Sequence, residues 1–183
     1  MGTLSIEIDE VTHCLINNET GKEVKTEVYR ITRAIDLKGY NTKDWYVNWA
    51  KMLKTSEVFA LMTEDSEIQG LAAVQDDSEA GIAIFNWAVV APWNNPMKLN
   101  GKPKKYLGVG AHLFAIAVDR SFSYGYDGVI LGYPSSKKLL DHYVKNLGAE
   151  PFRPFDNHQY AIVLMEEAAK KLREVYDYEK HYG

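Results

Sequence analysis

The residues of this chain best suited to bind an anion lie in the segment 104–113, KKYLGVGAHL. Gly108 and Gly110 follow a pair of lysines and open an amphipathic stretch that is typical of a helix. Glycine lets the backbone turn freely and approach a ligand closely. The first amides of a helix have no intrahelical partner, and the helix dipole adds positive potential there. The pattern therefore predicts a phosphate or pyrophosphate site, and the alternative is a tight turn that only packs the helix.

The segments on either side of the glycines predict how they are held. Residues 80–90 are a nearly continuous apolar run, which favours a central strand. Residues 91–103 contain three prolines and an Asn-Gly pair and are expected to form a loop. From the glycines a helix should continue to about Arg120, with its apolar face toward the core.

The rest of the chain predicts a strand hairpin, a helix and a meander before this unit, and two strands and two helices after it. Ser135 or Ser136 should cap the first of these later helices, and Gly148 should end it. The expected strands are 11–17, 23–32, 58–62, 68–74, 128–131 and 159–165, and the other expected helices run from 41 or 42 to about 54 and from 166 to about 180.

Composition and charge exclude several classes of protein. The 183 residues carry a net charge of −4, which argues against a protein whose main task is to grip nucleic acid. No run approaches the roughly 20 apolar residues of a membrane span, and residues 1–10 do not resemble a signal peptide. Cys14 is the one cysteine, so no internal disulfide is expected. We therefore expect a cytoplasmic protein that does not act on membranes or nucleic acid.

The order of elements and the segment Lys105-Tyr106-Leu107-Gly108-Val109-Gly110 resemble the GNAT superfamily of acyl-CoA-dependent N-acyltransferases. The family fingerprint is Arg or Gln, two residues, Gly, one residue, then Gly or Ala, and the resemblance extends over residues 58–165. It implies an α/β (α+β) fold with flanking helices around a mixed, mostly antiparallel central sheet. That sheet would have six to seven strands and be splayed between the fourth and fifth family strands. Residues 1–183 would form one acyltransferase-like domain, in which 1–33 is an added or altered strand hairpin and 166–183 is a C-terminal helix.

The resemblance also implies where the cofactor lies. Acetyl-CoA would be the co-substrate, with its pantetheine arm along the fourth family strand and its pyrophosphate on the glycine loop. Lys105 replaces the usual Arg or Gln and would supply charge without the planar fork of arginine. The expected backbone contacts are Ala88, Val89 and Val90 for pantetheine and Leu107, Gly108, Val109, Gly110 and Ala111 for pyrophosphate.

The family also suggests the acid and a further contact on the later helix. A tyrosine there often protonates the departing thiolate, and Tyr143 is the candidate. Gly148 follows it by five residues rather than the usual four, so a purely structural core tyrosine is the alternative. Ser136 stands where the family often has Asn, and would cap the helix, contact CoA, or do both.

No residue stands out as the general base. Residues 80–90 contain neither an acid nor a histidine, so His158, Glu79, Asp127 or a chain of waters would have to accept the proton. The other histidines show no metal-ligand spacing along the sequence, and no metal is expected.

The resemblance implies transfer of an acetyl group from acetyl-CoA to a primary amine of a small molecule or peptide. A non-catalytic acyl-CoA-binding regulatory module is the alternative, and an interaction protein that has lost CoA is a third possibility. The long 91–103 loop would be a lip over the acceptor site, or a surface excursion with Trp93 tucked down. A homodimer is compatible with the sequence, through the N-terminal hairpin or the C-terminal helix.

Overall fold

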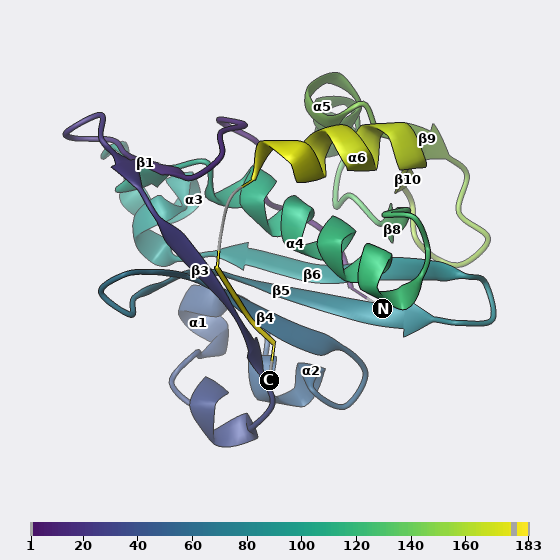
Figure 1. Cartoon of the computed structure of the whole chain (residues 1–183), viewed down its shortest axis with the longest axis horizontal. Helices are drawn as coiled ribbons and strands as arrows, with labels where there is room; N and C mark the ends of the chain where they lie inside the picture. The colour runs from purple at the N-terminus through teal and green to yellow at the C-terminus, as the bar shows by residue number, and fades with distance from the viewer. Residues whose placement is uncertain (1, 177–178, 183) are drawn as a thin grey trace.

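The computed structural model describes residues 2–176 and 179–182, and Figure 1 shows a long twisted sheet with helices on both faces. Over these residues the main sheet has eight strands in the order β11-β3-β4-β5-β6-β8-β10-β9. Their bounds in chain order are β3 (Thr26–Ile31), β4 (Glu57–Thr63), β5 (Ile68–Asp77), β6 (Ile82–Val90), β8 (Ile130–Gly132), β9 (Glu150–Phe152), β10 (Ala161–Leu164) and β11 (Glu179–His181). The predicted mixed, mostly antiparallel sheet is confirmed, because only the β6–β8 and β11–β3 pairs among these strands are parallel. The predicted number of six to seven strands is wrong, because β11 pairs with β3 where the sequence predicted the end of a helix.

The sheet opens at its centre. The parallel pairing of β6 with β8 covers only Ala83 to Phe85 on β6. Beyond Phe85, β6 continues to Val90 and stays paired with β5 on its other edge. The two strands therefore diverge, and the predicted splay lies between β6 and β8.

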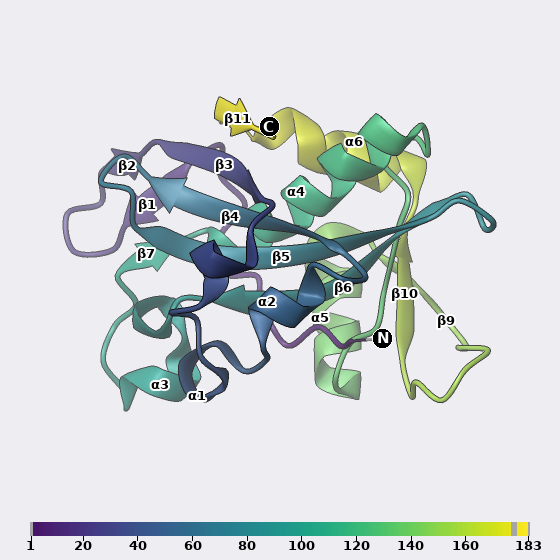
Figure 2. The ribbon, with the colours of Figure 1, turned by 90° about the horizontal axis from the view of Figure 1, so that it is seen from below.

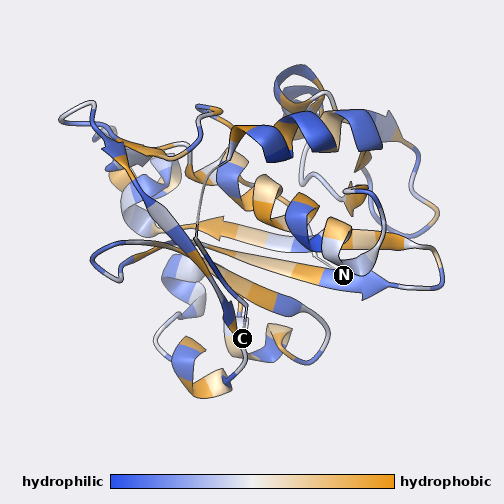
Figure 3. Cartoon of the chain, viewed as in Figure 1, coloured by the Kyte–Doolittle hydropathy of each residue, from blue (hydrophilic) through white to orange (hydrophobic). Residues whose placement is uncertain are grey.

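Helices pack on both faces of this sheet (Figures 1 and 2). One face carries α4 (Val109–Tyr124), with α6 (Glu166–Val175) over it and α5 (Lys137–Leu147) to one side. Helix α4 is buried along most of its length, whereas Figure 3 shows that α6 turns a hydrophilic side outward. The other face carries the short α1 (Thr42–Trp45) and α2 (Trp49–Met52), whose Trp45 and Trp49 belong to a second hydrophobic cluster.

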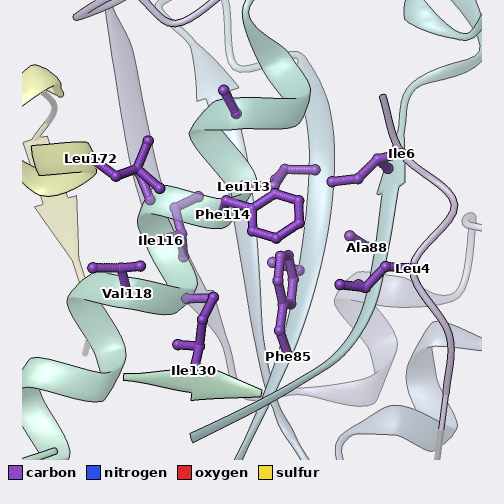
Figure 4. Close-up of a cluster of buried hydrophobic side chains, with 14 of the residues drawn as sticks. Leu4, Ile6, Phe85, Ala88, Leu113, Phe114, Ile116, Val118, Ile130 and Leu172 are labelled. Atoms are coloured by element: carbon purple, nitrogen blue, oxygen red, sulfur yellow. The ribbon is translucent and has the colours of Figure 1, made fainter. Parts of the chain in front are cut away.

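The main core lies between α4 and the sheet (Figure 4). The rings of Phe85 and Phe114 meet edge to face, 5.0 Å apart. Leu4 and Ile6, from the start of the chain, point into the same cluster. Leu4, Ile6 and Ile8 of the segment 2–9 are thus packed into the core, although its sequence did not predict an element.

The N-terminal hairpin is smaller than predicted. Segment 23–32 is interrupted at Lys25, and its two parts join different sheets. β1 (Leu15–Asn17) pairs with β2 (Glu23–Val24) on one side and with β7 (Tyr106–Leu107) on the other. This three-stranded sheet places the hairpin directly beside the glycine motif.

Three other sequence predictions are wrong in their bounds. The helix expected from 41 or 42 to 54 breaks at Tyr46, where φ is 64°, and Asn41 and Asn48 cap the two short pieces. The loop at 91–103 contains η2 (Pro92–Asn94) and α3 (Pro96–Leu99). The C-terminal helix ends at Val175, while part of its predicted extension, 177–178, lies outside the described residues.

A further 3-10 turn, η1 (Ala34–Leu37), joins β3 to α1. In the part of the chain that the structure describes, no helix is both long enough and apolar enough to cross a bilayer.

Candidate active site

A cavity of about 510 Å³ opens where β6 leaves β8, within the size range of small-molecule sites. Four segments form its walls: residues 2–9, the α1–α2 region, the end of β6, and the chain from Asn94 to Gly110. Rings contribute much of the lining, with Trp45, Tyr46, Trp49, Trp87 and Tyr106. The predicted pantetheine residues Ala88, Val89 and Val90 also line it.

The glycine motif has the predicted backbone conformation. Gly108 is the N-cap of α4 with φ 94°, a left-handed conformation that a side chain would strain. At Gly110, an added Cβ would lie 2.1 Å from the backbone oxygen of Glu7. Gly108 therefore allows a turn, and Gly110 allows the close approach of another backbone segment. That segment is the backbone at Glu7 of the same chain.

Residues 2–9, which we call the strap, lie in the opening between β6 and β8. The Leu4 amide donates to the backbone oxygen of Tyr133 at 2.8 Å, and the Ser135 amide donates to the backbone oxygen of Leu4 at 2.9 Å. Gly2 sits so close to β6 that a Cβ there would lie 2.1 Å from Trp87 Nε1. The strap therefore bridges the diverging strands.

The far end of the strap reaches the glycine loop. Asp9 Oδ1 accepts the Gly108 amide at 2.9 Å, and Asp9 Oδ2 lies 3.0 Å from Lys104 Nζ. Lys105, the predicted anion contact, instead pairs with Glu67 at 2.8 Å, and this hydrogen bond raises the pKa of Lys105. Of the two lysines, Lys104 is the one that lines the cavity.

Tyr143, the predicted acid, is fully buried beneath the strap. Its hydroxyl donates to the Ile6 carbonyl at 2.5 Å, and burial raises its pKa above the ordinary value. On the same helix, His142 Nε2 accepts the Ile8 amide at 2.8 Å. The catalytic role of Tyr143 stays a prediction, and in this arrangement its proton is held by the strap.

The other predicted site residues are Ser136 and the suggested general bases. The Ser136 side chain accepts the Leu139 amide, which confirms its capping role, while its contact with CoA stays a prediction. His158 stacks on Tyr133 at 3.7 Å and binds Asp156. None of the suggested bases, His158, Glu79 or Asp127, is among the described residues that line the cavity.

Sequence reasoning missed Glu7 and Asp9, the acids that line the cavity from the strap. The available signal was the alternation in residues 4–8, where Leu4, Ile6 and Ile8 are buried between polar neighbours. A period of two is typical of a strand with one buried face.

The structure confirms that Trp93 of the 91–103 loop is tucked down, while the role of the loop as a lip over the acceptor site stays a prediction. The indole nitrogen of Trp93 donates to Gln69 Oε1 at 2.8 Å. Asn94 donates to the same oxygen and accepts the Tyr106 amide, which ties the loop to the glycine motif. Further along the loop, Asn95 and Met97 line the cavity.

The spacing argument against a metal site overlooked one cross-strand group. Ligand atoms of His13, Cys14 and Glu23 lie within 4.8 Å of one another on the β1–β2 hairpin. His13 and Glu23 already form an ion pair at 3.3 Å and both are exposed.

Comparison with solved structures identifies the architecture. A GNAT family N-acetyltransferase from Escherichia coli, solved in complex with CoA, superposes with a TM-score of 0.52 at 11% identity. That match covers 88% of this chain and 92% of the other. The chain has the GNAT fold. A Klebsiella pneumoniae protein named as an acyl-CoA N-acyltransferase superposes with a TM-score of 0.50 at 14% identity, over 76% of this chain and 98% of that one. No protein-family model and no curated protein matches the sequence.

The GNAT fold implies a CoA site at the splay, and the residues present can be tested against it. The loop suits a pyrophosphate, because Gly108 and Lys104 already bind an anionic group, the Asp9 carboxylate. The groove between β6 and β8 does not have room for the pantetheine arm, because the strap fills this space and contacts Gly110. In the arrangement described, CoA does not fit.

Proposed function

We propose that this protein is an acyl-CoA-dependent N-acyltransferase that moves an acetyl group from acetyl-CoA to a primary amine of a small molecule or peptide. The observation that supports this most is the glycine loop at the splay of a GNAT fold, with Gly108 at a positive φ and its amide already bound to an anion. Acetyl-CoA would supply the activated acyl group, and the amides of residues 107–111 would bind its pyrophosphate.

The cavity beside the loop supports an amine as the acceptor. Its rings lie on α1, α2, β6 and β7 and in the link between α1 and α2, so they are held by segments other than the strap. At the rim, the ammonium group of Lys98 already lies 5.2 Å from the centre of the Tyr46 ring. Aromatic faces attract ammonium groups in this geometry. An amine with an apolar body could place its ammonium group over a ring face and pack its apolar part against the rings.

The cofactor half of the proposal is tested by two matched substitutions. Gly108 and Gly125 sit at opposite ends of α4, and both have positive φ, 94° and 88°. Gly108→Ala and Gly125→Ala should each destabilise the fold by about 1–2 kcal/mol, because each forces a side chain into the left-handed region. Only Gly108→Ala should weaken binding of acetyl-CoA in isothermal titration.

Turnover then tests the transfer itself. Consumption of acetyl-CoA would be measured against polyamines, aminoglycosides, amino acids and basic peptides. Binding of CoA without turnover on any amine would favour the regulatory module over the enzyme. Equal loss of affinity in the Gly108 and Gly125 variants would contradict the assignment of the loop, and no binding at millimolar CoA would contradict the function.

A further inference from the structure

The strap contacts β6, the chain that follows β8, and the glycine loop. At its start, Gly2 lies against Trp87 on β6. In the middle, Leu4 pairs with the backbone that follows β8, at Tyr133 and Ser135. At its end it reaches the loop, where the Glu7 backbone faces Gly110.

At the Asp9 end of the strap, the glycine loop already binds an anionic group. A carboxylate, Asp9, accepts a hydrogen bond from a helix N-terminal amide at 2.9 Å and from a lysine ammonium at 3.0 Å. These are the two kinds of donor that bind phosphate oxygens. Asp9 therefore occupies the position in which a phosphate would meet Gly108 and Lys104.

The strap also separates two spaces. Leu4, Ile6 and Ile8 face the core and are at most 6% exposed, while the residues between them face the cavity or solvent. If the strap left, the cavity and the opening between β6 and β8 would become continuous. The Tyr143 hydroxyl would lose its bond to Ile6 and would face that space.

We propose that residues 2–9 are an internal occupant of the acyl-CoA groove, and that acyl-CoA binds only when this strap is displaced. The inference rests on the proposed function and adds a regulatory step to it. The closed state holds Asp9 on the glycine loop and Ile6 on Tyr143. The open state exposes both groups to the cofactor. Because only the open state binds, the apparent affinity for CoA equals the affinity of the open state multiplied by the fraction of molecules that are open.

The test compares CoA affinity in variants that weaken the closed state. Asp9→Ala removes the carboxylate that binds Gly108 and Lys104, and should tighten CoA binding about tenfold if the closed state dominates in the wild type. Glu10→Ala is the matched control, because it removes the same charge from the next residue, which is exposed. It should change the affinity less than twofold.

Amide exchange in the wild-type protein reports the position of the strap directly. The Leu4 and Ile8 amides are bonded to Tyr133 and His142, so they should exchange slowly without ligand. Added CoA should make these two amides exchange faster while the rest of the sheet becomes better protected. Gly110→Ala gives a second check without ligand, because its Cβ would meet the Glu7 oxygen and should release the same two amides.

The outcomes separate the strap from the function. If CoA binds while the Leu4 and Ile8 amides stay protected, and Asp9→Ala binds no better than Glu10→Ala, the strap inference is overturned and the acyltransferase proposal stands. If the wild type, Asp9→Ala and a folded deletion of residues 2–9 all fail to bind CoA, the proposed function is overturned, and the strap is a permanent strand of the fold.

Discussion

The Tyr143 hydroxyl is bound by backbone, 2.5 Å from the Ile6 oxygen, and not by solvent. Removing this oxygen atom therefore tests two roles of Tyr143, the hydrogen bond to the strap and the proposed acid. Tyr143→Phe would take one hydrogen bond from the closed strap, worth about 0.5–1.5 kcal/mol. It would also remove the proposed acid.

We expect Tyr143→Phe to bind CoA about 2–10-fold more tightly and to transfer acetyl more slowly. Titration calorimetry measures the first effect and kcat the second. Tyr126→Phe is the control, because its hydroxyl bonds Asp76 at the surface, away from the cavity. Unchanged kcat would contradict the role of Tyr143 as acid, and unchanged CoA affinity would remove its hydroxyl from the strap mechanism.

At this scale the sequence predicted backbone roles better than side-chain partners. The cap at Ser136 and the turn at Gly108 depend on residues a few positions away, and both are present. The choice between Lys104 and Lys105 depends on Asp9 and Glu67, which are distant in sequence. A local pattern carries no information on which lysine meets which acid.

Helix α4 carries a histidine whose titration affects the stability of the whole fold. His112 is fully buried, beside Thr26 and the ring of Tyr176. Burial lowers its pKa from about 6.5 to about 3. As pH falls below about 6.5, the unfolded chain binds a proton at this site and the folded chain does not, so stability falls until the pH approaches 3.

The expected loss from His112 between pH 7 and pH 5 is about 2 kcal/mol of unfolding free energy. Urea unfolding at several pH values should therefore show a shallower pH dependence for His112→Leu than for the wild type, whatever the cost of the substitution at pH 7. Equal slopes for His112→Leu and the wild type would show that the pKa of His112 is the same in the folded and unfolded chains, which would contradict the effect of burial.

Element bounds were predicted well where the pattern is long and apolar. β6 and α4 were expected from runs of apolar residues, and both are present. The helix at 42–54 was expected to be continuous because its tryptophans recur at helical spacing, yet Tyr46 interrupts it with a positive φ. Its hydroxyl accepts a hydrogen bond from Asn95 in the distant 91–103 loop, a contact that no local pattern could show.

Over the whole molecule, the strap is the feature that the sequence concealed. Three alternating aliphatic residues in a short N-terminal segment fit an exposed tail as well as a buried strand. They are buried because β6, α4 and the chain after β8 form a groove, and those segments lie more than 70 residues away along the chain. Sequence reasoning identified the groove and its loop, and assigned them to a cofactor, without identifying the segment that fills them.

The thermodynamic consequence of an internal occupant is a final prediction. Ile6→Ala would destabilise the closed state by about 2–5 kcal/mol, since the side chain is 5% exposed in the main core. If the strap leaves when CoA binds, the CoA-bound protein has already lost this packing. At saturating CoA, Ile6→Ala should therefore melt close to the wild type, although without CoA it melts well below it.

Ile116→Ala provides the contrast, because Ile116 is a fully buried residue of α4 for which the structure shows no contact with the strap. It should lose similar stability with and without CoA, since its packing is the same in both. Thermal melts of the three proteins over a CoA series would measure the difference. If CoA stabilises Ile6→Ala and Ile116→Ala by the same amount, the strap stays seated when the cofactor binds, because only a contact that the bound state lacks can be compensated by the ligand.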